Sequence, residues 1–251
     1  MTVVLVHGVP ENAAVWDLLV DELTALGESD VLRLSPPGFG APIPDGFAAT
    51  MDGYREWLIA ELETVDGPVD LVGHDWGGGH VLNVVMARPD LVQTWVSDVP
   101  GLFDPEYVWH DLAQAWQTPE VGEAAVAEFT LMSDADRAEF LVGAGMSADV
   151  AARVSPACDE AMGRSILTLY RSAAQPVPAT AGANLEAAAA RPGLALLPTE
   201  DHFVGTEEQK RRAAARAGAR VEVLDGLGHW WLTHDPAVAA QVLVDFWTAN
   251  R

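Results

Sequence analysis

Short apolar runs alternate with longer helical patterns along the chain, and this alternation constrains the fold more than any other feature. The first apolar runs are residues 2–8 (TVVLVHG), 31–40 (VLRLSPPGFG) and 69–74 (VDLVGH), and helical patterns cover 16–27, 51–65 and 78–92. Further apolar runs occupy 94–98, 194–198 and 220–225, and a last helical pattern covers 235–250. Because repeated strand–helix units of this kind form parallel sheets, we predict an α/β fold with a mostly parallel sheet flanked by helices.

About 95 residues separate the apolar run at 94–98 from the next one at 194–198, and most of them have a helical pattern. A connection between two strands of one sheet is normally far shorter. We interpret this segment as a helical cap inserted into the fold. The predicted boundaries are residues 1–100 and 191–251 for the core and residues 101–190 for the cap.

Charge and composition argue against several classes of partner. The formal net charge is −23. The one lysine, Lys210, lies in a basic cluster with Arg211, Arg212, Arg216 and Arg220, which we interpret as a solvated helix face. So acidic a chain repels nucleic acids and anionic membranes, and we expect neither as a partner. The sequence has no apolar run long enough to span a bilayer and no recognisable signal peptide. Together with the single Cys158, these features favour a cytoplasmic protein.

Residues 73–77 read Gly73-His74-Asp75-Trp76-Gly77 and join an apolar run to a helical pattern. A glycine on each side lets the backbone turn tightly, so that the central side chain stands clear above the end of the strand. The backbone N–H of Trp76, at the start of the helix, would then face any negative charge that develops there. Asp75 is therefore a candidate nucleophile, and the alternative is a carboxylate that merely caps the helix.

Three other segments carry residues that would complete a catalytic site. The run His7-Gly8-Val9-Pro10 ends a predicted strand and could supply a second backbone donor, the N–H of Val9, while His7 itself is expected to pack in the loop. His229 follows a strand in a glycine-rich loop, where it could act as a general base. Asp201 lies just beyond another strand and would orient His229. Glu200 is the alternative acid, and His234 is expected to face the surface.

Together, the segments HGVP, GHDWGG, PTEDHFVG and GLGHWW resemble the α/β-hydrolase fold, and specifically the aspartate-nucleophile branch of epoxide hydrolases and haloalkane dehalogenases. The resemblance covers nearly the whole chain and is weakest in the cap. Members of that branch normally have two strands before the one that ends in His-Gly, whereas here this strand opens the chain. We therefore expect a short sheet of about six strands with one edge formed differently.

An aspartate nucleophile implies alkyl transfer instead of attack on a carbonyl group. A carboxylate attacks a saturated carbon that carries a leaving group and becomes part of an ester. Water activated by His229 would then hydrolyse this ester, while the amides of Val9 and Trp76 hold the oxyanion. The scheme requires no metal and no organic cofactor, and the sequence has no convincing metal-ligand spacing.

The resemblance also offers candidates for the group that assists the leaving oxygen of an epoxide. Epoxide hydrolases use two cap tyrosines, and the later one is matched by Tyr170, followed by Arg171 and lying 31 positions before Asp201. The position of the earlier tyrosine falls on Leu112, which cannot donate a proton. His110 is our preferred substitute, with a capping or packing function as the alternative. The expected substrate-binding residues are Tyr107, Trp109 and Trp116.

These features favour an epoxide hydrolase acting on a small apolar epoxide, and two alternatives stay open. A haloalkane dehalogenase would use the same nucleophile and hold the halide with Trp76 and a second N–H donor, often an asparagine at the position of Val9. Trp109 or Trp116 could replace that donor. The third hypothesis is a catalytically silent protein that binds a small apolar ligand. An exposed sheet edge could also be covered in a homodimer.

Overall fold

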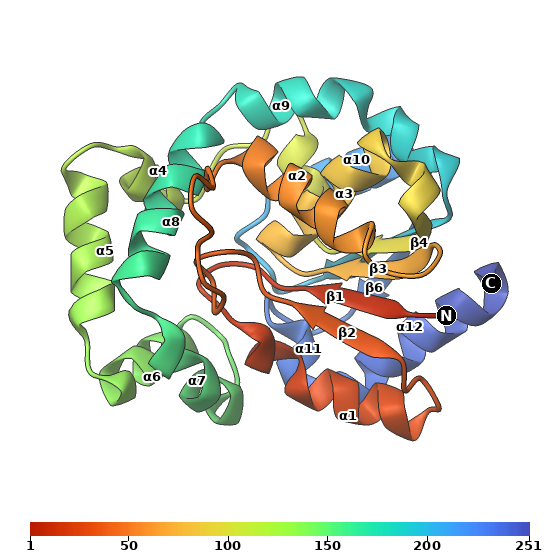
Figure 1. Ribbon diagram of the computed structural model, residues 1–251, viewed down its shortest axis with the longest axis horizontal. Helices are drawn as coiled ribbons and strands as arrows, with labels where there is room; N and C mark the ends of the chain where they lie inside the picture. The colour runs from red at the N-terminus through yellow and green to blue at the C-terminus, as the bar shows by residue number, and fades with distance from the viewer.

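The computed structural model describes residues 1–251 and contains one six-stranded sheet in which every neighbouring pair of strands is parallel. The strand order is β2-β1-β3-β4-β5-β6 (Figure 1). The strands are β1 (Val3–Val6), β2 (Val31–Leu34), β3 (Val69–Gly73), β4 (Val92–Ser97), β5 (Gly193–Pro198) and β6 (Arg220–Leu224). The predicted α/β fold with a short, parallel sheet is therefore confirmed.

The register of the sheet brings the carboxyl ends of its central strands together. Val6 of β1 pairs with Gly73 of β3, and Gly73 pairs with Ser97 of β4. The loops that follow these three strands consequently leave the sheet at the same edge, which is where parallel α/β sheets place their ligands. Strands β1 and β3 are buried along their whole length, as expected for a sheet with helices on both faces.

Helices cover both faces of the sheet (Figure 1). One face carries α1 and α12, which pack against each other, and the other carries α2 and α3. Four tryptophans, Trp16, Trp95, Trp231 and Trp247, are fully buried in the core. The core elements outside the sheet are η1 (Ala13–Trp16), α1 (Asp17–Ala25), α2 (Met51–Leu62), α3 (Trp76–Ala87), η2 (Pro89–Leu91), η3 (Pro100–Phe103), α10 (Glu207–Arg216), α11 (Trp231–His234) and α12 (Pro236–Asn250).

The segment between β4 and β5 contains helices only, and they occupy two different places. The helices from α4 to α8 form a lobe beside the sheet, at the left of Figure 1, whereas α9 and η5 lie along the core, where η5 packs on α3. The predicted cap, residues 101–190, thus includes one segment that packs on the core. The elements are α4 (Asp111–Gln117), α5 (Val121–Leu131), α6 (Asp134–Gly143), α7 (Ala148–Val154), η4 (Ser155–Ala157), α8 (Glu160–Ser172), α9 (Val177–Ala181) and η5 (Gly182–Ala190).

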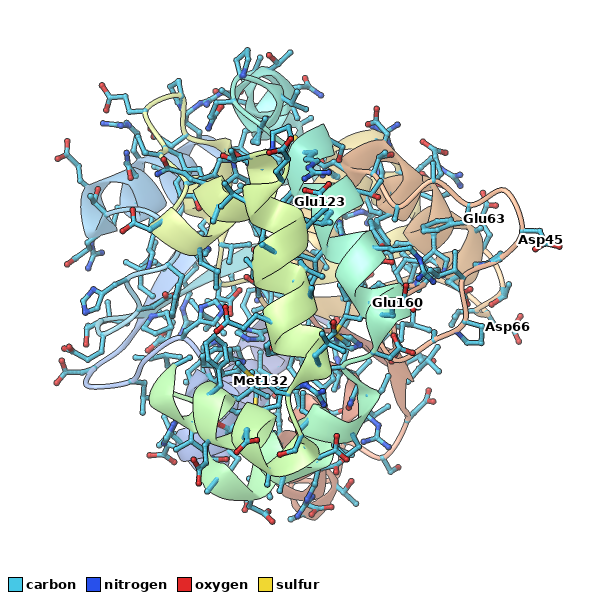
Figure 2. All side chains as sticks on the ribbon, turned by 90° about the vertical axis from the view of Figure 1, so that its left-hand side faces the viewer. Asp45, Glu63, Asp66, Glu123, Met132 and Glu160 are labelled. Carbon is cyan, nitrogen blue, oxygen red and sulfur yellow. The ribbon has the colours of Figure 1, made fainter.

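A buried arginine joins the helices of the lobe. The Arg137 guanidinium donates hydrogen bonds to the carbonyl oxygens of Phe129, Thr130 and Met132 at the end of α5, and to that of Ser155 in η4. These carbonyls at the end of α5 lack partners within the helix, so Arg137 satisfies groups that would otherwise be stranded. Figure 2 shows α5 facing the viewer beside α8.

None of the helices combines the length and the apolar composition needed to cross a membrane.

Candidate active site

The elbow between β3 and α3 has the backbone geometry of a nucleophile turn. Asp75 has φ of 51° and ψ of −127°, a region that residues with side chains seldom occupy. The turn needs the flanking glycines because a Cβ on Gly77 would overlap the carbonyl oxygen of Val6, and one on Gly73 would overlap that of Gly77. The Asp75 side chain makes no capping hydrogen bond to α3, so the helix-cap interpretation does not hold.

The carboxylate of Asp75 lies under two backbone amides. Val9 N–H donates to Asp75 Oδ1 at 2.8 Å, and the backbone amide of Trp76 favours the ionised carboxylate. Burial raises the pKa of Asp75 to about 6, although the neighbouring charge of His229 and the Trp76 amide oppose the rise. Asp75 is therefore mostly ionised at neutral pH. The two amides predicted from the sequence are thus both directed at this one carboxylate.

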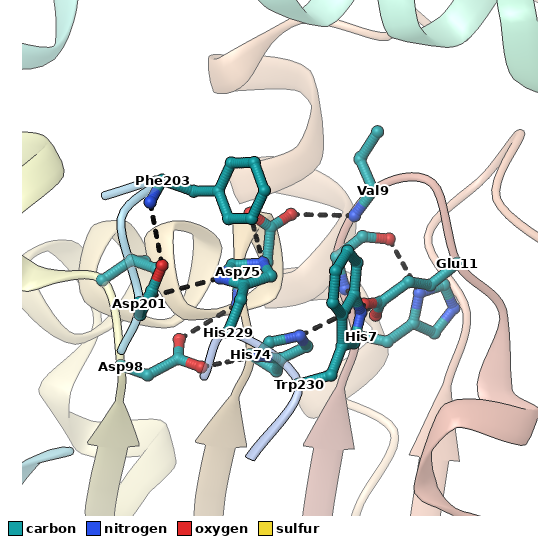
Figure 3. A network of polar contacts seen from close by, with 12 residues as sticks. His7, Val9, Glu11, His74, Asp75, Asp98, Asp201, Phe203, His229 and Trp230 are labelled. Atoms are coloured by element: carbon teal, nitrogen blue, oxygen red, sulfur yellow. Dashed lines mark hydrogen bonds and ion pairs between the residues drawn. The ribbon is translucent and has the colours of Figure 1, made fainter. Parts of the chain in front are cut away.

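His229 lies between two carboxylates in the loop after β6 (Figure 3). Its Nε2 is 3.6 Å from Asp75 Oδ2, and its Nδ1 is 3.2 Å from Asp201 Oδ2. Burial alone would lower the pKa of His229, but the charge of Asp201 and its hydrogen bond outweigh burial and raise it. The arrangement brings a carboxylate, an imidazole and a second carboxylate into line, in the chain order Asp75, Asp201, His229.

Asp201 is fixed by groups on its own loop and on α10. The backbone N–H of Phe203 donates to Asp201 Oδ1 at 2.9 Å, and Lys210 Nζ lies 3.5 Å from Oδ2. Burial would raise the pKa of Asp201, but His229 and Lys210 hold it well below its usual range. The alternative acid, Glu200, is exposed, and so is His234.

Lys210 corrects one interpretation made from the sequence. Its side chain is buried, not solvated, and Nζ donates to the backbone oxygen of Asp201 at 3.1 Å. Arg211 and Arg212 on the same helix do reach solvent-exposed carboxylates. The sequence shows three consecutive basic residues and gives no sign that the first one turns inward.

A group of charged side chains beneath the elbow has no function that could be predicted from the sequence. Glu11, His74 and Asp98 are buried and in contact with one another. Asp98 Oδ1 accepts a hydrogen bond from the backbone N–H of Asp75 at 3.0 Å. The only sequence signal was the position of these residues, because His74 adjoins Asp75 and both carboxylates follow strands of the sheet. No group of three or more histidine, cysteine, aspartate or glutamate side chains is arranged to hold a metal ion.

A cavity of about 270 Å³ lies between the strand ends and the cap helices. Asp75, His229 and Tyr170 line it together with mostly apolar side chains from α4, α5 and α6. Glu128 on α5 is the one other acidic residue in the lining, and no lysine or arginine contributes. The cavity therefore suits a neutral, apolar molecule that reaches Asp75.

Tyr170 projects from α8 and packs edge-on against Trp76, with 5.4 Å between the ring centroids. Burial and the charge of Asp75 raise the pKa of Tyr170 well above its usual value, while a hydrogen bond from the Trp76 side chain opposes the rise. Its hydroxyl group therefore stays protonated across the physiological range. Tyr170 and Asp75 line the same cavity, which is the arrangement that the resemblance to epoxide hydrolases predicts.

His110 lines the same cavity and also caps a helix. The backbone N–H of Ala113 donates to His110 Nδ1 at 3.3 Å, at the start of α4. Burial, together with the charge of His229, lowers the pKa of His110 to about 4, so the ring is neutral at physiological pH. Because Nδ1 accepts a hydrogen bond, the single proton of the neutral ring resides on Nε2.

The three residues expected to bind substrate occupy different positions. Trp116 lines the main cavity, whereas Tyr107 and Trp109 line a much smaller one, of about 20 Å³, beside Asp75 and Trp76. The polar groups of Tyr107 and Trp109 already donate hydrogen bonds within the protein. Trp109 Nε1–H donates to the backbone oxygen of Ala173 at 3.0 Å, and the Tyr107 hydroxyl donates to that of Phe203 at 3.3 Å.

The fold and the arrangement of these side chains define a hydrolase of the α/β class, and comparison with known families agrees. Residues 3–242 match the model of the alpha/beta hydrolase family. The chain belongs to this family.

Individual relatives are distant. Lipase LipV of Mycobacterium tuberculosis is 30% identical over 151 residues, which cover 59% of this chain and 52%, about half, of the lipase. The AB hydrolase superfamily protein YfhM of Bacillus subtilis is 22% identical over 270 residues, covering 97% of this chain and 89% of that protein. Among solved structures, haloalkane dehalogenase DbeA from Bradyrhizobium elkani superposes with a TM-score of 0.69 at 20% identity, covering 99% of this chain and 91% of DbeA. At such identity the structural likeness shows the fold alone.

Proposed function

We propose that this protein hydrolyses neutral, apolar epoxides to vicinal diols through an ester formed on Asp75. The observation that supports this most directly is the shared cavity, in which an ionisable carboxylate and a protonated tyrosine, Tyr170, face the same apolar space. A ring-opening reaction needs these two groups, because the carbon must be attacked while the departing oxygen receives a proton.

In the first step, Asp75 attacks one carbon of the epoxide ring. Oδ1 is held by the Val9 amide, so Oδ2 is the oxygen that forms the new C–O bond. The ring C–O bond breaks, and the leaving oxygen takes the hydroxyl proton of Tyr170. The products of this step are a hydroxyalkyl ester of Asp75 and a tyrosinate, which the N–H of Trp76 helps to stabilise.

In the second step, water attacks the Cγ atom of the esterified Asp75 and gives a proton to Nε2 of His229. The negative charge of the tetrahedral intermediate develops on the oxygen held by the amides of Val9 and Trp76. The intermediate collapses with cleavage of the ester bond, and the departing alkoxide takes the proton of the His229 imidazolium and leaves as the diol. The proton of the new Asp75 carboxyl group passes to the Tyr170 tyrosinate, which restores the Asp75 carboxylate and the starting enzyme. Asp201 stabilises the imidazolium form of His229 in this step.

His110 contributes a hydrogen bond in this scheme and not a proton. Its low pKa makes the ring neutral, and its remaining N–H, on Nε2, is free of the helix cap made by Nδ1. A neutral imidazole N–H is a good donor toward a developing oxyanion but a poor acid. Tyr170 is therefore the proton donor, and His110 assists it.

The surroundings of Asp75 favour an epoxide over a halide as the leaving group. A departing halide needs N–H donors around it, yet Trp109 Nε1–H is bonded to Ala173 and Val9 has an apolar side chain. The side chain of Trp76 packs edge-on against Tyr170. Trp116, the other replacement donor, lines the main cavity, and together with Trp76 it keeps dehalogenation as the second candidate.

Trapping of the covalent intermediate tests this proposal. In the variant His229→Gln the ester should form but not hydrolyse, so incubation with epoxyoctane should add the mass of the whole epoxide to the peptide that contains Asp75. Incubation with bromooctane tests the alternative, because dehalogenation would leave an octyl group alone on the same peptide.

One control variant and a wider panel of substrates make the result interpretable. In the double variant Asp75→Asn/His229→Gln, the same peptide should gain no mass from either compound, because the nucleophile is absent. If a panel of epoxides and haloalkanes of varied size leaves Asp75 unmodified in His229→Gln, covalent catalysis is wrong and the protein is a ligand-binding member of the family.

A further inference from the structure

Three charged side chains form a buried cluster beneath the nucleophile elbow (Figure 3). The imidazole of His74 lies between the carboxylates of Glu11 and Asp98, with Nδ1 2.5 Å from Asp98 Oδ2 and Nε2 3.1 Å from Glu11 Oε1. The side chains of all three are at most 1% exposed. We call this group the Glu11–His74–Asp98 clasp.

The geometry of the clasp requires His74 to carry a positive charge. Both ring nitrogens face a carboxylate oxygen, and only the imidazolium form has a proton on each nitrogen to donate. Burial would lower the pKa of His74, but the charges of Glu11 and Asp98 outweigh burial and raise it well above its usual value. A buried ion network of this kind is stable only while every member is paired.

Other groups around His74 do not reverse this conclusion. His229 and His7 are the neighbouring histidines, and each would oppose a proton on His74 only while protonated itself. Burial lowers the pKa of His7, which keeps that ring neutral. Trp16 and Trp231 pack edge-on against the remaining ring surface. Asp75 is the one further acid close by, and its charge favours the imidazolium.

Two loops of the active site are hydrogen-bonded to the clasp through its carboxylates. Glu11 Oε2 accepts from the backbone N–H of Gly8 at 3.1 Å, and the next residue is Val9, whose amide points at Asp75. Asp98 Oδ1 accepts from the backbone N–H of Asp75 itself at 3.0 Å. The donor loop and the elbow are therefore joined through His74.

The loop that carries His229 is attached at the same place. The indole N–H of Trp230 donates to Glu11, and that of Trp231 donates to Asp98 Oδ2 at 2.8 Å. These are the two residues that directly follow His229 in the sequence. One imidazolium thus links the three loops that hold the nucleophile, the backbone donor and the base.

The charge of His74 also lies close to the base. The rings of His74 and His229 are 4.8 Å apart between centroids. A positive charge at this distance opposes protonation of His229 and favours ionisation of Asp75. It therefore acts against Asp201, whose negative charge favours a proton on His229.

We propose that the clasp is a positioning and charge-setting device: it holds the three catalytic loops in register, and its imidazolium offsets part of the attraction of Asp201 for a proton on His229, so that His229 can accept a proton from water at a lower pH than it would beside Asp201 alone. His74 does not line the substrate cavity, so it acts through its neighbours. The effect on catalysis rests on the proposed function, whereas the charge state of the clasp does not.

The resting protein tests the clasp without any substrate. Imidazole ¹⁵N NMR should show both nitrogens of His74 protonated at neutral pH. In His74→Gln, the titration of His229 should move upward by roughly one pH unit, because a charge about 5 Å away is removed at an intermediate effective dielectric. His202→Gln is the matched control, since that histidine is exposed and outside the clasp. It should leave the His229 titration in place.

A second variant covers the case in which His74→Gln does not fold. The double variant His74→Gln/Glu11→Gln removes one buried charge of each sign and keeps groups that can hydrogen-bond, and it should move the His229 titration in the same direction by a smaller amount. A singly protonated His74 in the parent protein at neutral pH would overturn the proposal. So would a His229 titration that shifts no more in the folded double variant than in His202→Gln.

Kinetics supply the separate test of the catalytic consequence. In single turnovers with epoxyoctane, the rate of ester hydrolysis should rise with pH as His229 loses its proton. In His74→Gln and in the double variant, this rise should occur at a higher pH than in the parent. The rate of ester formation should be less affected. If no epoxide forms an ester, the proposed function fails while the NMR result still decides the clasp. If the rise stays at the parent pH although the His229 titration has moved, His229 is not the base and the catalytic consequence is wrong.

Discussion

Replacing the candidate nucleophile should make the protein more stable, and the gain should depend on pH. Burial raises the pKa of Asp75 from 3.8 to about 6, so the folded state holds an ionised carboxylate less readily than the unfolded chain does. At about 1.4 kcal/mol per pKa unit, this corresponds to a cost of about 3 kcal/mol in the free energy of unfolding at neutral pH. Asp75→Asn has nearly the same shape, can still accept from the Val9 amide, and removes the charge.

The sign of the effect follows from proton binding. Between pH 4 and 6 the folded protein binds the Asp75 proton and the unfolded chain releases it, so the parent loses stability as pH rises through this window. Below about pH 4 the Asp75 carboxyl group is protonated in both the folded and the unfolded state, so Asp75→Asn should not change the free energy of unfolding by removing a charge. Above pH 6 the full gain of about 3 kcal/mol should appear, which for a chain of this size raises the Tm by roughly 6 to 12 °C.

Thermal unfolding of parent and variant at pH 4 and pH 7.5 measures this difference. Asp45→Asn is the matched control, because Asp45 is an exposed acid far along a loop (Figure 2). It should change the Tm little at either pH. An Asp75→Asn protein whose Tm difference from the parent is the same at both pH values would refute the argument that a buried charge is the cause.

Three further predictions concern the site. Tyr170→Phe should slow ester formation from epoxides by at least about a hundredfold, measured in single turnovers, because it removes the proton donor; unchanged rates would defeat that assignment. Gly8→Ala should abolish activity, since its Cβ would overlap the Asp75 carboxylate, whereas Gly143→Ala, with open space around it, should leave activity intact. Epoxyoctane should be hydrolysed with a kcat/KM about tenfold above that of an epoxyoctanoate, because the carboxylate of the latter is repelled by Glu128 in the cavity lining. Glu128→Gln should reduce this ratio of the two kcat/KM values.

Much of the fold could be predicted because its signals are local. Six apolar runs predicted six strands, and all six occur, since short buried segments between helices have few other ways to satisfy their backbone. The long gap between the fourth and fifth runs predicted an insert. The sequence did not show that η5 would leave the lobe and pack on α3, because that depends on surfaces brought together only by folding.

The candidate site, like the fold, could be predicted from the sequence only in part. Asp75, Asp201 and His229 each follow a strand, and parallel strands deliver their carboxyl ends to one edge, so their meeting was predictable from order and position. Lys210 was misread, because three successive basic residues on a helix point in different directions and the pattern alone does not say which one faces inward. Trp109 was one of two candidates for a halide donor under the dehalogenase alternative, and its indole N–H is bonded to a backbone carbonyl.

By itself, the sequence determined the α/β fold, the strained elbow and the residue types that meet at the strand ends, because these follow from spacing, glycine positions and strand order. The tertiary structure determined the protonation states of the side chains in and around the site. Burial raised the pKa of Asp75, neighbouring carboxylates placed a proton on His74, and a helix cap placed the proton of His110 on Nε2. A protonation state depends on the groups and the water that surround an atom in three dimensions, which the order of residues along the chain does not specify.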